Sequence, residues 1–186
     1  MTRCYIVRHG ESRWNAEQRW AGQADPALSA KGEEEALAAG AYLATLGFVS
    51  VTSSPLQRAR LTAVIIARTL AIPLGAPIGE LAELDIGYAS GLTVPEINAR
   101  YPGLIDDWHA GKIVEFPGGE GWSDFVQRVQ HGLLRLADGE ETPVLVVAHE
   151  GVMRAINYLL HEPLGRPANL EGRWIELAGA RVRAVS

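Results

Sequence analysis

Short apolar runs alternate with longer amphipathic segments along most of this chain, and this alternation constrains the fold more than any other feature. The clearest run, Val144 to Ala148, is apolar throughout, which is typical of a strand buried on both faces. Runs at Cys4 to Val7 and at Phe48 to Thr52 are each followed by a helical pattern. Strands that alternate with helices favour parallel pairing, so we predict an α/β fold with a mainly parallel sheet.

Capping residues mark where the predicted helices begin and end. One helix is predicted from about Ala30 to Leu46, with Ser29 as its N-cap and Gly47 ending it. Another begins at Pro55, which suits the first turn of a helix, and runs to about Leu70.

The last third of the chain continues the pattern. An apolar helical face over Phe125 to Leu136 precedes the strand at Val144, and a helix after His149 is predicted to reach about Leu160. Alternating residues at Arg173 to Leu177 and at Arg181 to Val185 predict two terminal strands at sheet edges. Such an edge strand is able to pair across a homodimer.

Length and composition predict a single domain. The chain has 186 residues, of which 47% are hydrophobic, enough for one sizeable core over residues 1–186. Residues 73–121 are rich in Gly and Pro and only weakly periodic, apart from a short helix that starts at Pro95 and ends before Pro102. We interpret this stretch as a loop-rich cap.

The charge pattern narrows the range of partners. The formal net charge is -5 and the basic residues are scattered, which argues against binding to nucleic acid or to an anionic membrane. No apolar run approaches the roughly 20 residues that span a bilayer, so we expect a cytoplasmic protein. The single cysteine, Cys4, lies within an apolar strand and is interpreted as a structural thiol.

Three polar groups directly follow predicted strands, at Arg8 to Ser12, at Ser53 to Arg58 and at His149 to Gly151. The carboxyl ends of the strands form the ligand crevice in open α/β sheets, so these segments are expected to converge. Together they supply two arginines and two histidines. Guanidinium groups match phosphate oxygens and stay charged at physiological pH, so this set predicts a site for a phosphoryl group.

His9 is the candidate nucleophile of this site. Imidazole can attack phosphorus when one ring nitrogen is unprotonated and a hydrogen bond holds the other, and the Gly10 carbonyl is placed to accept that bond. A leaving alkoxide also needs a proton from a carboxylic acid with a raised pKa. Glu80, Glu83 and Asp85 are candidates for this acid, and chemistry alone does not choose among them.

Four ordered motifs resemble those of the histidine phosphatase superfamily, also called phosphoglycerate mutase-like, and the resemblance covers nearly the whole chain. It implies a three-layer α/β/α sandwich. The matching segments are Arg8-His9-Gly10-Glu11-Ser12 with Trp14-Asn15, Ser53-Ser54-Pro55-Leu56-Gln57-Arg58-Ala59, Leu81-Ala82-Glu83-Leu84-Asp85-Ile86-Gly87 followed by Pro117-Gly118-Gly119-Glu120, and His149-Glu150-Gly151-Val152-Met153-Arg154.

The resemblance also implies a role for particular residues. His9 matches the phosphorylated nucleophile, Glu83 the general acid, and His149 the second histidine, which donates a hydrogen bond to the transferring group. Arg8 and Arg58 match the phosphate clamp, and no metal or other cofactor is implied. Further positions that match the phosphate pocket or its rim are Ser12, Asn15 and Gly22.

Glu150 departs from the commonest family pattern, which has glycine beside the second histidine. The backbone N–H of Glu150 is expected to serve the phosphate if the carboxylate turns away.

A metal site and further roles for tryptophans and histidines are less well supported by the sequence. A metal site of His9, Glu83 and His149 is disfavoured because two arginines beside a dication would repel it. Trp14, Trp20 and Trp108 are able to wall a substrate cleft but more often serve a core. The remaining histidines, His109, His131 and His161, are interpreted as structural or surface groups.

The residues thus predict a phosphatase that hydrolyses a small-molecule phosphomonoester through a phosphohistidine on His9. A phosphoglycerate mutase that uses 2,3-bisphosphoglycerate is the main alternative, although the segment after Glu83 is short and poor in Lys and Arg for a mutase. A catalytically silent phospho-ligand binding domain is a third hypothesis. The compact length and the Pro117 to Glu120 stretch also resemble α-ribazole phosphatases.

Overall fold

A five-stranded mixed sheet forms the centre of the protein in the computed structural model, which describes residues 1–137, 142–179 and 181–185. Three neighbouring strands are parallel, and two further strands extend the sheet in antiparallel fashion. In spatial order the strands are β2 (Ser50–Ser53), β3 (Val144–Ala148), β1 (Thr2–Arg8), β4 (Gly172–Ala178) and β5 (Arg181–Ala184).

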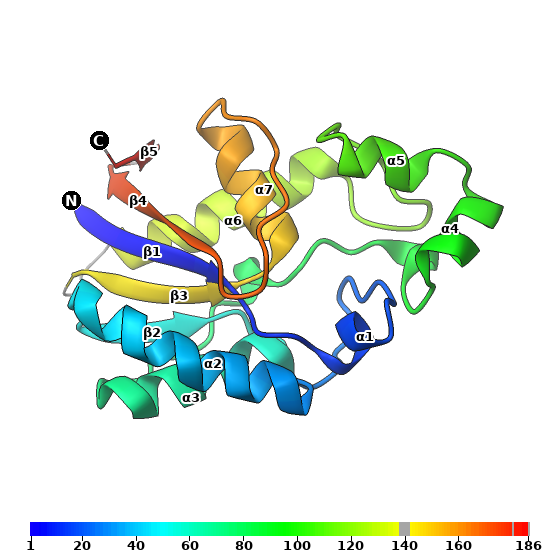
Figure 1. Cartoon of the computed structure of the whole chain (residues 1–186). Helices are drawn as coiled ribbons and strands as arrows, with labels where there is room; N and C mark the ends of the chain where they lie inside the picture. The colour runs from blue at the N-terminus through cyan, green and yellow to red at the C-terminus, as the bar shows by residue number, and fades with distance from the viewer. Residues whose placement is uncertain (138–141, 180, 186) are drawn as a thin grey trace.

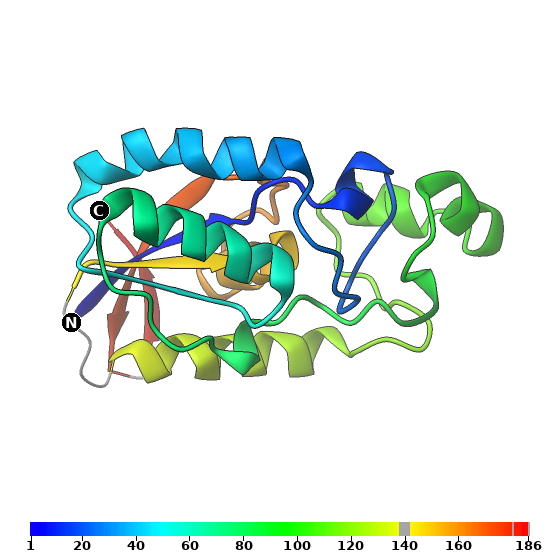
Figure 2. The ribbon, with the colours of Figure 1, turned by 90° about the horizontal axis from the view of Figure 1, so that it is seen from below.

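Helices cover both faces of this sheet, as predicted for an α/β/α sandwich. Figures 1 and 2 show α2 (Ala30–Leu43) and α3 (Gln57–Leu70) on one face, and α6 (Trp122–Leu134) and α7 (Glu150–Leu159) on the other. The core is accordingly split into two clusters, because alternate residues of each strand point to opposite faces. Ile6 and Val146 pack toward α6 and α7, whereas Val7 and Val147 pack toward α2 and α3.

The predicted strand at Val144 is buried at all five positions because it lies inside the sheet and has helices on both faces. One prediction for the sheet was wrong. The strand at Arg173 to Leu177 is not an edge strand, because β4 pairs with β1 on one side and with β5 on the other. β5 and β2 form the two edges.

The helix boundaries follow their capping residues closely. Ser29 accepts a hydrogen bond from Gly32 N and caps α2, and a 3₁₀ turn, η1 (Ala44–Leu46), leads to Gly47 at φ 71°. Pro55 precedes α3 rather than starting it, since Leu56 is the N-cap. A similar 3₁₀ turn, η4 (Arg135–Ala137), ends the helix that starts at Trp122.

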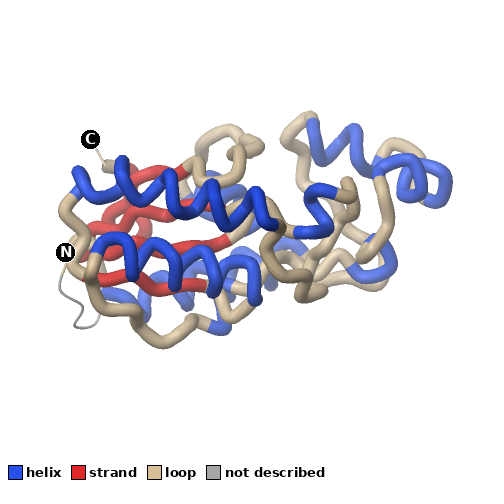
Figure 3. Tube along the Cα trace, turned by 60° about the horizontal axis from the view of Figure 1, so that its bottom comes forward, coloured by secondary structure: helices blue, strands red, loops and turns tan. Residues whose placement is uncertain are grey.

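Most of the segment predicted as a cap lies beyond the carboxyl ends of the parallel strands, at the right of Figures 1 and 3. Its first residues instead run beside β2, where Leu74 bridges to Val51 and Ile78 N donates to Ser53 O at 2.8 Å. Thr93 and Glu96 form a capping box at the start of the predicted helix near Pro95. A further short helix was missed because it follows Gly103, a residue that usually marks a turn. The elements beyond the sheet are α1 (Arg13–Ala16), η3 (Gly87–Ala89), α4 (Val94–Arg100) and α5 (Leu104–His109), while η2 (Gly79–Leu81) packs against α6.

Within residues 1–137, 142–179 and 181–185, no helix is both long enough and apolar enough to cross a membrane.

Candidate active site

The three polar segments converge at the carboxyl ends of β1, β2 and β3. Arg8 is the last residue of β1, and the backbone N–H of His9 still donates to Ala148 O of β3, at 3.0 Å. Ser54 N donates to Val147 O at 2.9 Å on the other side of the same strand. The parallel register therefore brings together loops that lie far apart in the sequence, as predicted.

His9 is buried, and hydrogen bonds hold both of its ring nitrogens. Nδ1 lies 2.6 Å from the Gly10 carbonyl, which accepts only, so Nδ1 carries the proton and Nε2 keeps its lone pair. This is the partner predicted for His9. Asn169 Nδ2 also donates to the His9 carbonyl at 2.7 Å and fixes the backbone. Burial, with the charges of Arg58 and Arg8, lowers the pKa of His9 well below its ordinary value, so the ring stays neutral.

Arg58 lies in the first turn of α3, and each nitrogen of its guanidinium donates one hydrogen bond. Its Nε donates to His9 Nε2 at 3.2 Å, and its two terminal nitrogens donate to the carbonyls of Ala24 and Gly22 at 2.8 Å. Gly22 has φ 52° and packs against Ile86 where a Cβ would stand, so a larger residue would displace the carbonyl that holds Arg58.

His149 is buried beside His9, with 5.2 Å between the ring centroids. Its Nε2 lies 2.7 Å from Ser54 Oγ, while Nδ1 is buried and has no hydrogen-bond partner among the described residues. Burial, reinforced by nearby positive charge, lowers the pKa of this histidine well below its ordinary value. The sequence placed Ser54 at the junction of strand and helix but gave it no role.

Glu83 is the only one of the three candidate carboxylates that lines the cavity at these strand ends in the described structure. Its Oε1 accepts from Leu84 N at 2.7 Å and its Oε2 from Gly151 N at 3.1 Å. Burial raises the pKa of Glu83 despite these bonds and the charge of Arg58. Glu80 instead pairs with Arg135 at 2.8 Å, and Asp85 accepts from Gly87 N at 2.9 Å.

Arg128 of α6 holds the segment that carries Glu83. Its guanidinium donates to the carbonyls of Glu80 and Ala82 at 2.7 Å and to that of Glu83 at 2.9 Å. Glu120 accepts from it at 2.6 Å and 2.8 Å. Glu120 belongs to one of the motifs noted in the sequence, but nothing in the local pattern of α6 marked Arg128.

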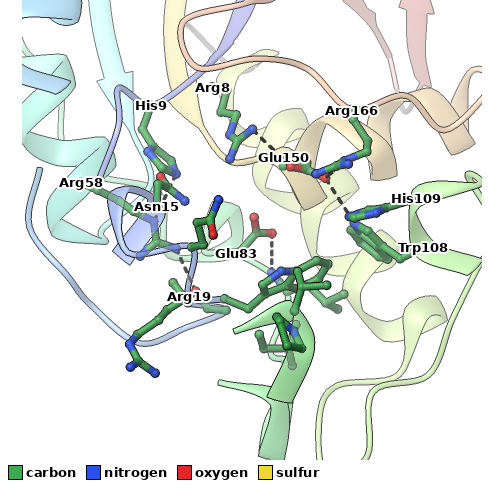
Figure 4. A pocket seen from close by; sticks show the side chains of 18 residues that line it. Arg8, His9, Asn15, Arg19, Arg58, Glu83, Trp108, His109, Glu150 and Arg166 are labelled. Carbon is green, nitrogen blue, oxygen red and sulfur yellow. Dashed lines mark hydrogen bonds and ion pairs between the residues drawn. The ribbon is translucent and has the colours of Figure 1, made fainter. Parts of the chain in front are cut away.

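The Glu150 carboxylate does not turn away from the site, so the condition under which its backbone N–H was expected to serve the phosphate is not met. It pairs with Arg8 NH1 at 3.2 Å and accepts a hydrogen bond from Trp108 Nε1 at 3.2 Å. Arg166 Nε lies 3.7 Å away on the same carboxylate. Figure 4 shows Glu150 between Arg8 and Arg166, with Trp108 beside it.

Two of the three rim residues predicted from the resemblance line the cavity, and one does not. Asn15 and Gly22 are part of its wall. Ser12 is fully buried outside the cavity wall, where its Oγ accepts from Asn15 N and its own N–H donates to Asn15 Oδ1, both at 3.1 Å. Ser12 therefore caps α1 and positions Asn15.

The cavity has a volume of about 350 Å³ and combines a polar floor with a largely apolar and aromatic wall (Figure 4). His109, His131 and His161 are all exposed, as surface groups, and His109 also lines the cavity. Trp20 and Trp108 also line it. Arg166 was missed because it follows no predicted strand. The wall beyond the floor consists of Gln18, Arg19, Trp20, Ala21, Leu84, Ile86, Val94, Pro95, Trp108, His109 and Arg166.

Within the described residues, no cluster of three or more histidine, cysteine, aspartate or glutamate side chains is arranged to hold a metal ion. The lone pair of His9 Nε2 faces the Arg58 guanidinium. This contact is suited to an anion-binding site, since a cation there would meet a fixed positive charge.

Comparison with known sequences shows that nearly the whole chain matches one protein family. The sequence model described as "Histidine phosphatase superfamily (branch 1)" matches residues 4–179. The bifunctional protein Rv2228c of Mycobacterium tuberculosis is 39% identical over 150 residues, which cover 80% of this chain and 41% of that protein. This chain thus spans less than half the length of that relative. The probable phosphoglycerate mutase GpmB of Salmonella paratyphi B is 36% identical over 180 residues, covering 93% of this chain and 80% of GpmB.

A solved structure shares the fold over nearly its full length. The mycobacterial glucosyl-3-phosphoglycerate phosphatase Rv2419c, in complex with VO3, superposes with a TM-score of 0.85 at 28% identity. The match covers 97% of this chain and 95% of that one.

Proposed function

Because the chain belongs to the histidine phosphatase superfamily, we propose that it hydrolyses small-molecule phosphomonoesters through a phosphohistidine on His9. One observation carries this proposal. The Gly10 carbonyl fixes the proton on His9 Nδ1, which leaves an unprotonated Nε2 beside Arg58 in a cavity that also contains a buried carboxyl group. This is the set of groups that phosphoryl transfer to imidazole requires.

In the first step, Nε2 of His9 attacks phosphorus while the bond from phosphorus to the ester oxygen breaks. The departing oxygen takes the proton of the Glu83 carboxyl group, and a free alcohol leaves. Burial raises the pKa of Glu83 and so favours the protonated form that this step needs.

In the second step, the ionised Glu83 carboxylate removes a proton from water as the water oxygen attacks phosphorus. The bond from phosphorus to Nε2 breaks, and inorganic phosphate leaves. His9 regains its lone pair and Glu83 its proton, so the cycle closes.

Arg8, Arg58 and His149 are proposed to stabilise the phosphoryl group during both steps. Arg58 is fixed by carbonyl groups, and Arg8 by Pro167 O at 2.8 Å, so these cations need little reorganisation as charge develops on the phosphoryl oxygens. The buried Nδ1 of His149 has no partner among the described residues and is the ring nitrogen free to bond a phosphoryl oxygen.

The test is hydrolysis of 4-nitrophenyl phosphate together with trapping of the intermediate. The native protein should release phosphate and, after rapid quenching, carry acid-labile, alkali-stable phosphate. His9→Ala should abolish both. Undiminished turnover by His9→Ala would contradict the mechanism. If the native protein binds phosphoesters stably but does not turn them over, it is a catalytically silent binding domain.

A phosphoglycerate mutase is the second candidate, favoured by the similarity to GpmB. A mutase would return the phosphoryl group from His9 to a second position on the substrate instead of to water. Assaying phosphoglycerate isomerisation alongside phosphate release separates the two activities. Rapid isomerisation with little release would establish the mutase. α-Ribazole phosphate is one specific substrate that such a panel of phosphoesters should include.

A further inference from the structure

The part of the cavity beyond the phosphate floor, here called the outer pocket, contains two arginines, Arg19 and Arg166, and each already pairs with a carboxylate. Its walls include Trp20, Trp108, Val94 and Ile86, which present largely apolar surface. The alcohol portion of the substrate must occupy this space, since His9 and the two clamp arginines, Arg8 and Arg58, bind the phosphoryl group at the floor. The charge balance of the outer pocket therefore determines which alcohols fit.

Arg19 is neutralised by partners on its own rim of the outer pocket. Its NH1 donates to Gly91 O at 2.7 Å, and it pairs with Glu17 at 3.4 Å and with Glu96 at 3.6 Å. A substrate anion would have to compete with both carboxylates for this guanidinium.

The cationic groups on the opposite wall are compensated in the same way. Arg166 pairs with Glu150 at 3.7 Å. His109 lies nearby, and burial together with the charge of Arg166 lowers its pKa, so it is neutral near pH 7. A substrate anion would therefore have to share Arg166 with Glu150, the carboxylate that also pairs with Arg8.

Glu150 adds a fixed negative charge at the junction of the floor and the outer pocket. Its side chain is only 15% exposed, and Arg8 and Trp108 Nε1 hold it from two sides. When a phosphoryl group engages Arg8, the Glu150 carboxylate loses part of its compensation and faces the alcohol portion of the substrate. A carboxylate on that alcohol would be repelled, whereas a hydroxyl group can donate a hydrogen bond to Glu150.

We propose that Glu150 makes the outer pocket selective for phosphomonoesters whose alcohol portion is uncharged and bears hydroxyl groups, and that it excludes esters with a second acidic group. This inference rests on the proposed phosphatase function and specifies its substrate class. Glu150 acts here as a specificity determinant, a role that its position beside His149 in the sequence did not suggest.

The experiment compares glycerol 3-phosphate with 3-phosphoglycerate, which differ only in a CH₂OH group in place of a carboxylate. Each is assayed as a substrate by phosphate release and as a competitor of 4-nitrophenyl phosphate, so relative affinity is measured even for a slow ester. The native protein should prefer glycerol 3-phosphate by about tenfold or more, and Glu150→Gln should lower this preference about tenfold.

Two further variants separate local charge from general effects. Glu176→Gln removes the same charge on β4, where Glu176 pairs with Arg3 near the opposite end of β1, and should leave the preference unchanged. Arg166→Gln removes a cation that offsets Glu150 and should strengthen the preference. Thermal unfolding of each variant confirms that it is folded.

The outcomes distinguish this inference from the function on which it rests. Suppose that 4-nitrophenyl phosphate is hydrolysed, and that 3-phosphoglycerate is bound and hydrolysed to the same extent as glycerol 3-phosphate. The proposed selectivity is then wrong, and the phosphatase proposal stands. A preference that does not change in Glu150→Gln, or changes equally in Glu176→Gln, removes Glu150 from that role. If 4-nitrophenyl phosphate is not hydrolysed and His9 is not phosphorylated, both proposals fail.

Discussion

The guanidinium of Arg58 donates its Nε–H to Nε2 of His9, at 3.2 Å, so a fixed cation holds the nitrogen that is proposed to attack phosphorus. The same contact keeps a proton off this nitrogen, because a protonated imidazole would face Arg58 with a second donor and a second positive charge. An incoming phosphoryl group must share Arg58 with His9. The nucleophile and the clamp therefore form a single unit.

Replacing Arg58 should test this unit. Lysine keeps the charge but cannot reach His9 and the carbonyls of Gly22 and Ala24 together, because it lacks the planar fork. Arg58→Lys should therefore lower kcat/KM for phosphoesters by about 100-fold or more, close to the loss in Arg58→Ala. Full activity of Arg58→Lys, measured by phosphate release, would show that charge alone is sufficient.

The general-acid role of Glu83 predicts a dependence on the leaving group. Glu83→Gln should reduce hydrolysis of an alkyl ester such as glycerol 3-phosphate by about 10²- to 10⁴-fold. It should reduce hydrolysis of 4-nitrophenyl phosphate less in the phosphorylation step, because nitrophenolate leaves without a proton. Burst kinetics separate this step from hydrolysis of the phosphohistidine. Equal losses in the phosphorylation step with both esters would argue against proton donation by Glu83.

The same residue should control the alkaline side of the pH profile. Burial raises the pKa of Glu83, so its acid form persists above the usual range of a carboxyl group and is lost as pH rises through this raised pKa. Because the pKa of His9 is lowered, the nucleophile stays unprotonated even at pH values well below the ordinary pKa of a histidine. The kcat for an alkyl ester should thus decline toward high pH, and Glu83→Gln should remove this decline while leaving the acid limb.

Gly151 offers a variant that moves Glu83 without removing it. A Cβ at this position would lie 2.2 Å from Glu83 Oε1, so the carboxylate must shift and the bond from Gly151 N must weaken. Gly151 lies in the first turn of α7, where the higher helix propensity of alanine offsets part of the cost of this weakened hydrogen bond, so Gly151→Ala should stay folded while activity falls about 10- to 100-fold. Gly165→Ala is the matched control, because a Cβ there makes only ordinary contacts.

The buried histidines predict a change of stability with pH. The pKa of His149 in the folded protein lies well below its value of 6.5 in the unfolded chain, so the unfolded chain binds more protons as pH falls below 6.5. The free energy of unfolding should therefore decrease by up to about 1.4 kcal/mol per pH unit for this residue. Glu83 acts in the opposite direction, because its raised pKa lets the folded state bind the proton first.

The contribution of His149 is isolated by comparing His149→Gln with the native protein in denaturant titrations between about pH 7 and pH 5. The free energy of unfolding of the variant should fall less steeply as pH decreases over this range, because the variant lacks an imidazole that takes up a proton only on unfolding. Parallel pH slopes for the two proteins would mean that the pKa of His149 is the same in the folded and unfolded chains, which would contradict the lowered pKa.

Local patterns were enough to predict most of the elements and the convergence of the site. The apolar run at Val144 and the cap at Ser29 act over a few neighbouring residues, so a linear sequence records them directly. The motif at Arg8 and His9 follows its strand immediately, and parallel pairing then requires it to meet His149. The antiparallel neighbours of β4 were not predicted, because partner choice is not encoded in a single strand's alternation.

By itself, the sequence determined the α/β alternation, the motifs at the strand ends and the family resemblance that implied the sandwich, because hydrophobic periodicity and motif spacing are properties of neighbouring residues. Only the tertiary structure decided where the Glu150 carboxylate points. Residue chemistry alone does not choose among Glu80, Glu83 and Asp85; the motif indicated Glu83, and the structure shows how Arg128 of α6 fixes their segment with Glu83 inward. The electrostatic field of the pocket depends on such partners, which are close in space but distant in the sequence. The class of ester that we propose for the pocket depends on them for the same reason.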